Sequence, residues 1–222
     1  MADYSATRDR VEQYFDRSAT KVWERLTSDA PVSRIRQTVR EGRDRMREVM
    51  LSRLPNDLRG ARVLDAGCGT GLMAVELATR GAYVHAVDIS PQLIGIAEAR
   101  MPEGLRGKVT FQAGDMTAPE HGHFDYVMAM DSLIYYRDTD IAAVLTKLGQ
   151  RTSEAVVFTV APRTPFLMTF FTLGKLFPRS DRSPVMIPHA FATLAKTVGP
   201  GLTRVDRVSR GFYISECLEF RP

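Results

Sequence analysis

The chain has 222 residues, a length that suits one domain with a short extension rather than two full domains. Its composition, 44% hydrophobic and 25% charged, is ordinary for a globular protein, and no stretch reaches the roughly 20 apolar residues of a membrane span. The net charge is only +4, and no basic run alternates with aromatic residues, so we expect no nucleic-acid partner. Cys68 and Cys217 lie outside any cluster, and the first residues lack the features of a secretory signal. We therefore expect a cytoplasmic protein with no disulfide framework and no zinc site.

Two helices are predicted before residue 59, and we interpret residues 1–58 as an N-terminal helical arm or cap. Apolar residues recur at helical spacing first at Val11, Phe15, Val22 and Leu26, and then at Ile35, Val39, Met46, Val49 and Met50. Arginines, Arg43 and Arg47 among them, crowd the remaining faces of the second helix. Such a charged face is usually solvated; the alternative is that it attracts an anionic substrate or a membrane surface.

Residues 59–222 alternate between strand and helix patterns, which indicates βαβ units and a largely parallel sheet. Predicted strands cover residues 62–66, 83–87, 109–113, 126–130 and 155–160, and a closing pair covers 204–208 and 213–219. Predicted helices cover residues 72–79, 91–100 and 138–149. The sequence therefore predicts an α/β domain with a mostly parallel, seven-stranded sheet and a C-terminal antiparallel pair.

One Phe-rich segment, residues 166–177, interrupts this alternation, and we interpret residues 163–186 as an insertion. A buried helix is one reading of it. The alternative is a lid over an apolar acceptor, or an interfacial helix, with Phe166, Phe170 and Phe171 as candidate substrate-binding residues.

The clearest motif is a strand that runs into a Gly-rich turn and then a helix. Asp65 lies near the end of that strand, and Gly67, Cys68 and Gly69 lie in the turn, where glycines allow a ligand to approach the backbone closely. Asp88 ends the next strand, where a carboxylate can accept hydrogen bonds from two ribose hydroxyls. A dinucleotide site would share this acid, but its G-x-G-x-x-G spacing is absent at this turn.

The run Asp-Ala-Gly-Cys-Gly-Thr-Gly resembles the first motif of the class I S-adenosylmethionine-dependent methyltransferases, which share a Rossmann-like α/β sandwich. The resemblance covers about residues 60–160. It implies that Asp65 lies near the methionine amino group and that Asp115 faces the adenine amino group. It also implies cofactor contacts from Ile89, Met116 and Met130, with S-adenosylmethionine as cofactor, S-adenosylhomocysteine as product and no protein-bound metal.

Loose matches over nearly the whole chain resemble, more narrowly, the magnesium protoporphyrin IX methyltransferases of bacteriochlorophyll and chlorophyll synthesis. These matches are residues 14–16, 23–25, 35–43 and 130–136, together with the Phe-rich segment. The resemblance implies that one propionate of the magnesium porphyrin accepts the methyl group and becomes a methyl ester. The partners it implies are the magnesium porphyrin, the porphyrin-carrying subunit of magnesium chelatase and the cytoplasmic face of the photosynthetic membrane.

Three residues are candidate catalytic groups. Tyr14 and Tyr135 would orient the carboxylate or close the site, although the family pattern has His where this chain has Tyr135. His189 follows Pro188 at a predicted helix start, a place more typical of a capping or surface histidine than of a ligand contact. His85, inside a predicted strand, is interpreted as structural.

Two other functions stay open at this stage. One is a methyltransferase that acts on another apolar small molecule, such as a quinone precursor, a fatty acid or an amine. The other is a Rossmann-type binding module or an NAD-linked oxidoreductase, which the glycine spacing and the lack of a Lys/Tyr pair disfavour.

Overall fold

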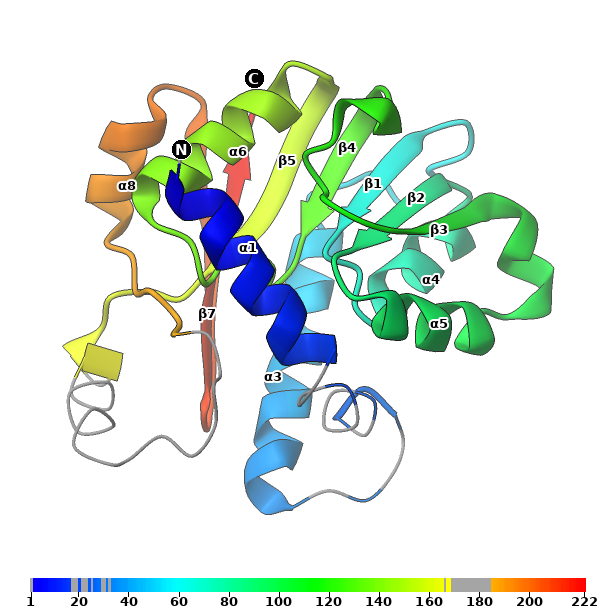
Figure 1. Cartoon of the computed structure of the whole chain (residues 1–222), viewed down its shortest axis with the longest axis horizontal. Coiled ribbons are helices and arrows are strands. Elements are labelled where there is room, and N and C mark those ends of the chain that lie inside the picture. Colours follow the sequence, from blue (N-terminus) through cyan, green and yellow to red (C-terminus); the bar gives the residue numbers. More distant parts are fainter. Residues whose placement is uncertain are drawn as a thin grey trace.

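The structure, a computed structural model, describes residues 2–16, 20, 24, 26–28, 31, 33–165, 167–168 and 185–222. Figure 1 shows one twisted sheet with helices on both of its faces. None of the helices in these described ranges is long and apolar enough to cross a membrane. Phe166, Phe170 and Phe171 lie outside the described residues, so their expected role stays a prediction.

Seven strands form the sheet, and their order explains where a ligand can bind. The strands are β1 (Arg62–Ala66), β2 (Tyr83–Asp88), β3 (Val109–Ala113), β4 (Phe124–Ala129), β5 (Thr152–Val160), β6 (Leu202–Arg210) and β7 (Tyr213–Phe220). They are ordered β3-β2-β1-β4-β5-β7-β6; β1 to β5 pair in parallel, and β7 is antiparallel to both β5 and β6. The order reverses between β1 and β4, so a crevice is expected outside the carboxyl ends of these strands.

Helices of the described ranges surround the sheet. They are α1 (Ala2–Tyr14), α3 (Arg34–Leu51), α4 (Leu72–Thr79), α5 (Pro91–Arg100), α6 (Asp138–Gly149) and α8 (Phe191–Val198), with short 3-10 turns at η2 (Glu103–Lys108) and η3 (Pro119–His121). The predicted α/β sandwich, with its closing antiparallel pair and N-terminal helices, is confirmed. The division at residue 58 into an arm and a domain stays a prediction.

Two hydrophobic clusters fill the space between the helices and the sheet. One joins α3 and α4 to the sheet, with Met46 and Leu77 fully buried. The other joins α6 and α8 to the opposite face, with Ile141 and Leu194 fully buried. Burying apolar side chains on both faces is what a central parallel sheet requires.

Helix α3 packs closely against the C-terminal hairpin. A Cβ added at Gly42 would lie 2.7 Å from the ring of Tyr213, so the small residue allows α3 to approach β7. The side chains of Arg43 and Arg47 are only 17% and 16% exposed. The expectation of a solvated arginine face is therefore wrong for these two residues.

Most predicted elements match the structure, and the differences have local causes. β4 begins at Phe124 instead of residue 126, because a register shift lies between Phe124 and Tyr126. α1 begins well before the first apolar residue of its predicted pattern, and Val22 lies outside the described residues. His189 is only 3% exposed and precedes the start of α8, so the expectation of a surface position is wrong.

Candidate functional site

The Gly-rich turn joins β1 to α4 and is hydrogen-bonded to the neighbouring strand, β2. The backbone N–H groups of Gly67 and Cys68 donate to Val87 O at 2.8 and 3.0 Å. Gly67 has a φ of 82° and Gly71 a φ of 83°, in the left-handed region that favours glycine. The turn is thus held open at the amino end of α4, where backbone N–H groups can meet a ligand.

Asp88 ends β2 and faces this turn. Its two carboxylate oxygens accept hydrogen bonds from Gly69 N at 2.8 Å and from Ser90 N at 2.9 Å. Burial nevertheless raises the pKa of Asp88, because it outweighs these two hydrogen bonds. These hydrogen bonds fix the carboxylate beside the Gly-rich turn, and its contact with the ribose stays a prediction.

Asp65, on β1, is 1% exposed. Burial, assisted by the nearby Asp88, raises the pKa of Asp65 to about 7. Its Oδ2 is buried and has no hydrogen-bond partner among the described residues. A buried carboxylate oxygen without a partner is costly, so this atom fits a cationic ligand group such as an amino group.

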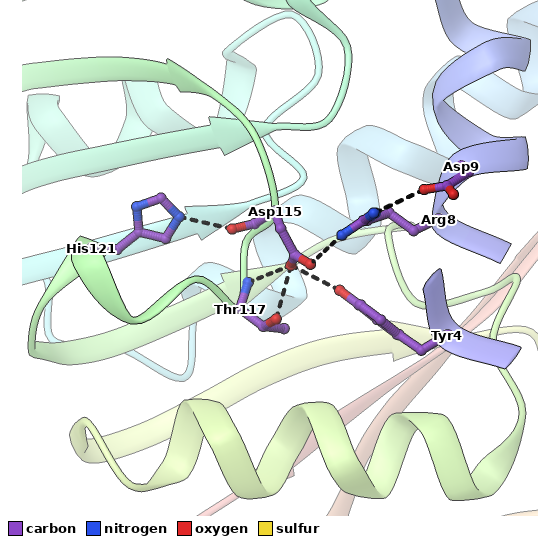
Figure 2. A network of polar contacts seen from close by, with 6 residues as sticks. All are labelled: Tyr4, Arg8, Asp9, Asp115, Thr117 and His121. Carbon is purple, nitrogen blue, oxygen red and sulfur yellow. Dashed lines mark hydrogen bonds and ion pairs between the residues drawn. The ribbon is translucent and has the colours of Figure 1, made fainter. Parts of the chain in front are cut away.

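Asp115 follows β3 and connects the sheet to α1, as Figure 2 shows. Tyr4 OH donates to its Oδ1 at 2.9 Å, Arg8 Nη1 lies 3.1 Å from its Oδ2, and Thr117 donates to Oδ1 from both its N and its Oγ1. Burial opposes ionisation of Asp115, but these hydrogen bonds outweigh it and lower its pKa below the ordinary value. The ring of Tyr4 also stacks on Tyr136, with centroids 5.0 Å apart. α1 therefore closes the predicted adenine end of the site. Tyr4 and Arg8 lie outside the apolar pattern from which the first helix was predicted.

One cavity brings these groups together at the carboxyl ends of the parallel strands. All nine predicted cofactor-binding residues line it: Asp65, Gly67, Cys68, Gly69, Asp88, Ile89, Asp115, Met116 and Met130. Tyr4, Arg8, Val11 and Phe15 add a wall from the N-terminal segment. Burial raises the pKa of Cys68, so its thiol stays protonated and acts as an apolar wall.

The loop after β4 carries a polar cluster that the sequence analysis missed. Arg43 Nη1 lies 2.6 Å from Asp131 Oδ2, and Tyr213 OH donates to Asp131 Oδ1 at 3.1 Å. Thr159 Oγ1 donates to the same carboxylate at 3.2 Å and accepts from the backbone N–H of Asp131 at 2.8 Å. Arg43 and Asp131 both line the cavity. Asp131 adopts a φ of 55°, which is uncommon for a residue other than glycine.

Of the three candidate catalytic residues, one lines the cavity. Tyr135 lines it, and burial, with Asp131 and Tyr14 nearby, raises its pKa, so its hydroxyl stays protonated at neutral pH. Tyr14 packs edge-on against Phe15, with ring centroids 5.3 Å apart, and lies outside the set of described residues that line the cavity. His189 is also outside that set; its Nδ1 hydrogen-bonds Asp138 at the start of α6. Of the three, Tyr135 alone is placed to contact a ligand of the cavity described here.

A Rossmann-like sandwich with a Gly-rich turn, an acid ending β2 and an acid after β3 defines a class I S-adenosylmethionine-dependent methyltransferase. A family model described as the magnesium-protoporphyrin IX methyltransferase C-terminus matches residues 129–222, and a methyltransferase-domain model matches residues 63–153. The chain is 68% identical to the magnesium-protoporphyrin O-methyltransferase of Rhodobacter capsulatus, covering 100% of this chain and 99% of that protein. It therefore belongs to the magnesium-protoporphyrin methyltransferase family.

More distant relatives agree. The magnesium-protoporphyrin O-methyltransferase of Synechocystis sp. is 30% identical over 216 residues, 94% of each chain. The crystal structure of magnesium protoporphyrin IX methyltransferase from Synechocystis PCC 6803 with bound SAH (S-adenosylhomocysteine) has a TM-score of 0.83 at 29% identity. That comparison covers 99% of this chain and 100% of the other.

Proposed function

We propose that the chain transfers a methyl group from S-adenosylmethionine to a propionate carboxylate of magnesium protoporphyrin IX. The product is the monomethyl ester used in bacteriochlorophyll and chlorophyll synthesis. The observation that carries this proposal is the 68% identity, over the full length, to a magnesium-protoporphyrin O-methyltransferase. The lining of the cavity supports it independently, because its acids and glycines suit the cofactor.

The cofactor fits the residues at the bottom of the cavity. S-adenosylmethionine supplies an electrophilic methyl group on a sulfonium centre. Asp65 Oδ2 would accept a hydrogen bond from the amino group, and Asp88 would hold the ribose hydroxyls. Gly67 would let the cofactor approach the backbone closely, and a side chain there would also clash with Ser132, whose Cβ would lie 2.4 Å from an added Cβ. Asp115, with Met116 and Met130, would border the adenine.

Methyl transfer to a carboxylate requires the protein mainly to orient the acceptor and to exclude water from the site. A propionate has a pKa near that of Glu, about 4.3, so it is ionised at neutral pH and needs no general base. The described residues contain no group of three His, Cys, Asp or Glu side chains that could hold a metal ion. Tyr135, held in its protonated form, could donate a hydrogen bond that orients the carboxylate. Positioning and exclusion of water would then supply the rate enhancement.

A panel of acceptors tests this function. Purified protein and methyl-labelled S-adenosylmethionine should label magnesium protoporphyrin, and should not label a catechol quinone precursor, a fatty acid or an amine at the same concentration. Label in any of those three acceptors at the rate of the porphyrin would favour the broader alternative, a methyltransferase for apolar small molecules.

We also infer that the chain works in the cytoplasm, at the surface of the photosynthetic membrane. Ile35 and Phe212 are apolar yet 56% and 52% exposed, and Arg34 and Arg36 beside Ile35 are exposed too. Exposed apolar groups next to cationic ones suit an anionic lipid surface. The porphyrin-carrying subunit of magnesium chelatase is the second partner that we propose, since it would deliver an insoluble substrate.

Sedimentation with vesicles tests the membrane contact. The protein should co-sediment with phosphatidylglycerol vesicles more than with phosphatidylcholine vesicles, and Ile35→Ser with Phe212→Ser should reduce that binding. Equal partition of the wild-type and doubly substituted proteins would contradict the contact. Retention of the protein on immobilised chelatase subunit, lost in the same variant, would assign this surface to the subunit instead.

A further inference from the structure

Two polar residues that line the cavity, Arg43 on α3 and Ser132 after β4, have no place in the predicted cofactor contacts. We propose that Arg43 and Ser132 form the subsite that binds the carboxylate of the acceptor. Asp131, which also lines the cavity, forms an ion pair with Arg43 and directly precedes Ser132 in the chain. The inference rests on the proposed function, because it names the groups that would hold the methyl-accepting propionate.

Ser132 carries the first observation. Its Oγ is buried and has no hydrogen-bond partner within the described part of the chain. A buried hydroxyl without a partner is expensive, so a ligand group is expected beside it. The position that a Cβ would take on Gly67 is 2.4 Å from Ser132 Cβ and 3.2 Å from its Oγ. Ser132 therefore sits directly on the turn that holds the cofactor, where the acceptor and the cofactor must meet.

Arg43 carries the second observation. Its guanidinium is held by Asp131 at 2.6 Å, and the two side chains are only 17% and 10% exposed. Asp131 is in turn fixed by Tyr213 and Thr159, at the cost of a left-handed backbone. Such a strained backbone persists where the surrounding structure holds the residue firmly, and strained residues are concentrated at functional sites. The guanidinium is thus pre-oriented, and its planar fork matches a carboxylate.

The ion pair also suits the chemistry. A lone buried arginine would bind a carboxylate strongly but would withdraw charge from its oxygens, which must attack the methyl carbon. Paired with Asp131, Arg43 contributes little net charge, so it can orient the acceptor while leaving it nucleophilic. Ser132 would donate a neutral hydrogen bond to the same group. Close packing of Gly42 on Tyr213 keeps the backbone of Arg43 in place.

The test compares magnesium protoporphyrin with its dimethyl ester, which has the same ring and no free carboxylate. Dissociation constants come from porphyrin fluorescence quenching, and SAH affinity from calorimetry on the same samples. Arg43→Gln should weaken binding of the free acid about tenfold, and Ser132→Ala should weaken it about threefold or more, as expected for loss of a charged and a neutral hydrogen bond. Binding of the dimethyl ester and of SAH should change less than about twofold. Arg45→Gln is the matched control, because Arg45 is on the same helix, 64% exposed and paired with Glu48; it should change nothing.

Other outcomes overturn the inference in identifiable ways. An equal loss for the acid and the ester would show that the two side chains bind the ring and not the carboxylate. A loss of SAH affinity in Ser132→Ala would assign that hydroxyl to the cofactor. If Arg43→Gln melts at a lower temperature, the test uses Arg43→Lys and Ser132→Ala instead. Unchanged affinity of both variants for the free-acid porphyrin would contradict the proposed subsite. The proposed function fails separately: it would be refuted by a wild-type protein that transfers no label to the porphyrin. The binding data on the variants test only the subsite.

Discussion

Arg43 Nη1 and Asp131 Oδ2 lie 2.6 Å apart although 88 positions separate the two residues in the chain. The pair joins α3, which precedes the sheet, to the loop after β4, and both residues line the cavity. Tyr213, on the last strand, binds the same carboxylate. The N-terminal segment thus supplies part of the acceptor wall, and its contacts reach the cofactor end as well, through Tyr4 and Asp115.

Asp65 should make cofactor binding depend on pH. Its pKa of about 7 is raised above that of an ordinary carboxyl group, so part of the ligand-free protein is protonated at neutral pH. A cationic amino group binds the ionised form, so affinity should fall about tenfold per pH unit below the pKa. SAH titrations between about pH 8 and about pH 6, in buffers of different ionisation enthalpy, should show proton release near neutrality.

The variant Asp65→Asn provides the control for that experiment. It should bind SAH weakly at every pH and release no proton. Stability has the opposite dependence: the free energy of unfolding of the ligand-free protein should fall as pH rises from about 4 to about 7 and stay low above that. Between these values the carboxyl group ionises in the unfolded chain but stays protonated in the fold, where burial raises its pKa. Asp65→Asn should therefore melt at a higher temperature than the wild-type protein at about pH 8. A pH-independent SAH affinity in the wild-type protein would remove Asp65 from the amino-group site.

Gly67→Ala should abolish cofactor binding and destabilise the fold more than an equivalent change elsewhere. The new Cβ would meet Ser132 at 2.4 Å, and the φ of 82° is unfavourable for alanine. Gly60→Ala is the matched control, since its φ is 84° but nothing lies within 4 Å of the added atom. The control should cost about 1–2 kcal/mol from backbone strain alone. Urea unfolding of both proteins measures the difference in their free energies of unfolding. Equal losses in the two variants would mean that the loop after β4 shifts to accommodate the new Cβ and that the contact with Ser132 costs nothing.

Asp88→Ala should weaken SAH binding by roughly 1.5–3 kcal/mol, the usual loss for hydrogen bonds to a charged group. The replacement also removes the acceptor of Gly69 N and Ser90 N, so the turn should loosen. Asp88→Asn keeps one acceptor oxygen, and we expect it to lose less affinity than Asp88→Ala. Calorimetry that finds unchanged affinity in both variants would place the ribose elsewhere.

Tyr4→Phe should loosen α1 while leaving the sheet intact. The ring can still stack on Tyr136, so the change isolates the hydrogen bond from Tyr4 OH to Asp115. Amide exchange in α1 should accelerate up to about tenfold, the factor for loss of about one hydrogen bond. Tyr83→Phe, at a residue that is 59% exposed on β2, is the control and should have no effect. If α1 exchanges equally in both variants, the contact with Asp115 does not hold the helix.

The sequence predicted the sheet and the cofactor end of the cavity because their signals are local. Five of the helices and strands have the predicted bounds, since each begins or ends at a turn residue, a proline or a cap; α5, for example, begins at Pro91 with Ser90 capping Leu93 N. Asp65 follows from the Gly-rich motif, and Asp88 follows from its place at the end of the next strand.

The acceptor wall could not be predicted in the same way. Arg43 is one of several arginines on its helix, and only the distant Asp131 distinguishes it from a solvated one. Ser132 is a candidate for binding the acceptor only because it lies against Gly67, 65 positions earlier in the chain, and nothing in the sequence indicates that contact. A surface position was expected for His189 because the sequence does not indicate its contacts with Asp138 and with the backbone of Ala161, which lie 51 and 28 positions earlier in the chain. Contacts between segments that are distant in the chain produce no regular spacing of residues from which they could be predicted.

The measurement that tests the central claim most directly is the chemical identity of the methylated product. Magnesium protoporphyrin incubated with the protein and methyl-labelled S-adenosylmethionine should gain one methyl group by mass. Mild alkali should then release all of the label as methanol, because a carboxylate acceptor gives a base-labile ester. A product that keeps its label through alkali, or no labelled porphyrin at all beside a protein that still binds SAH, would contradict the account.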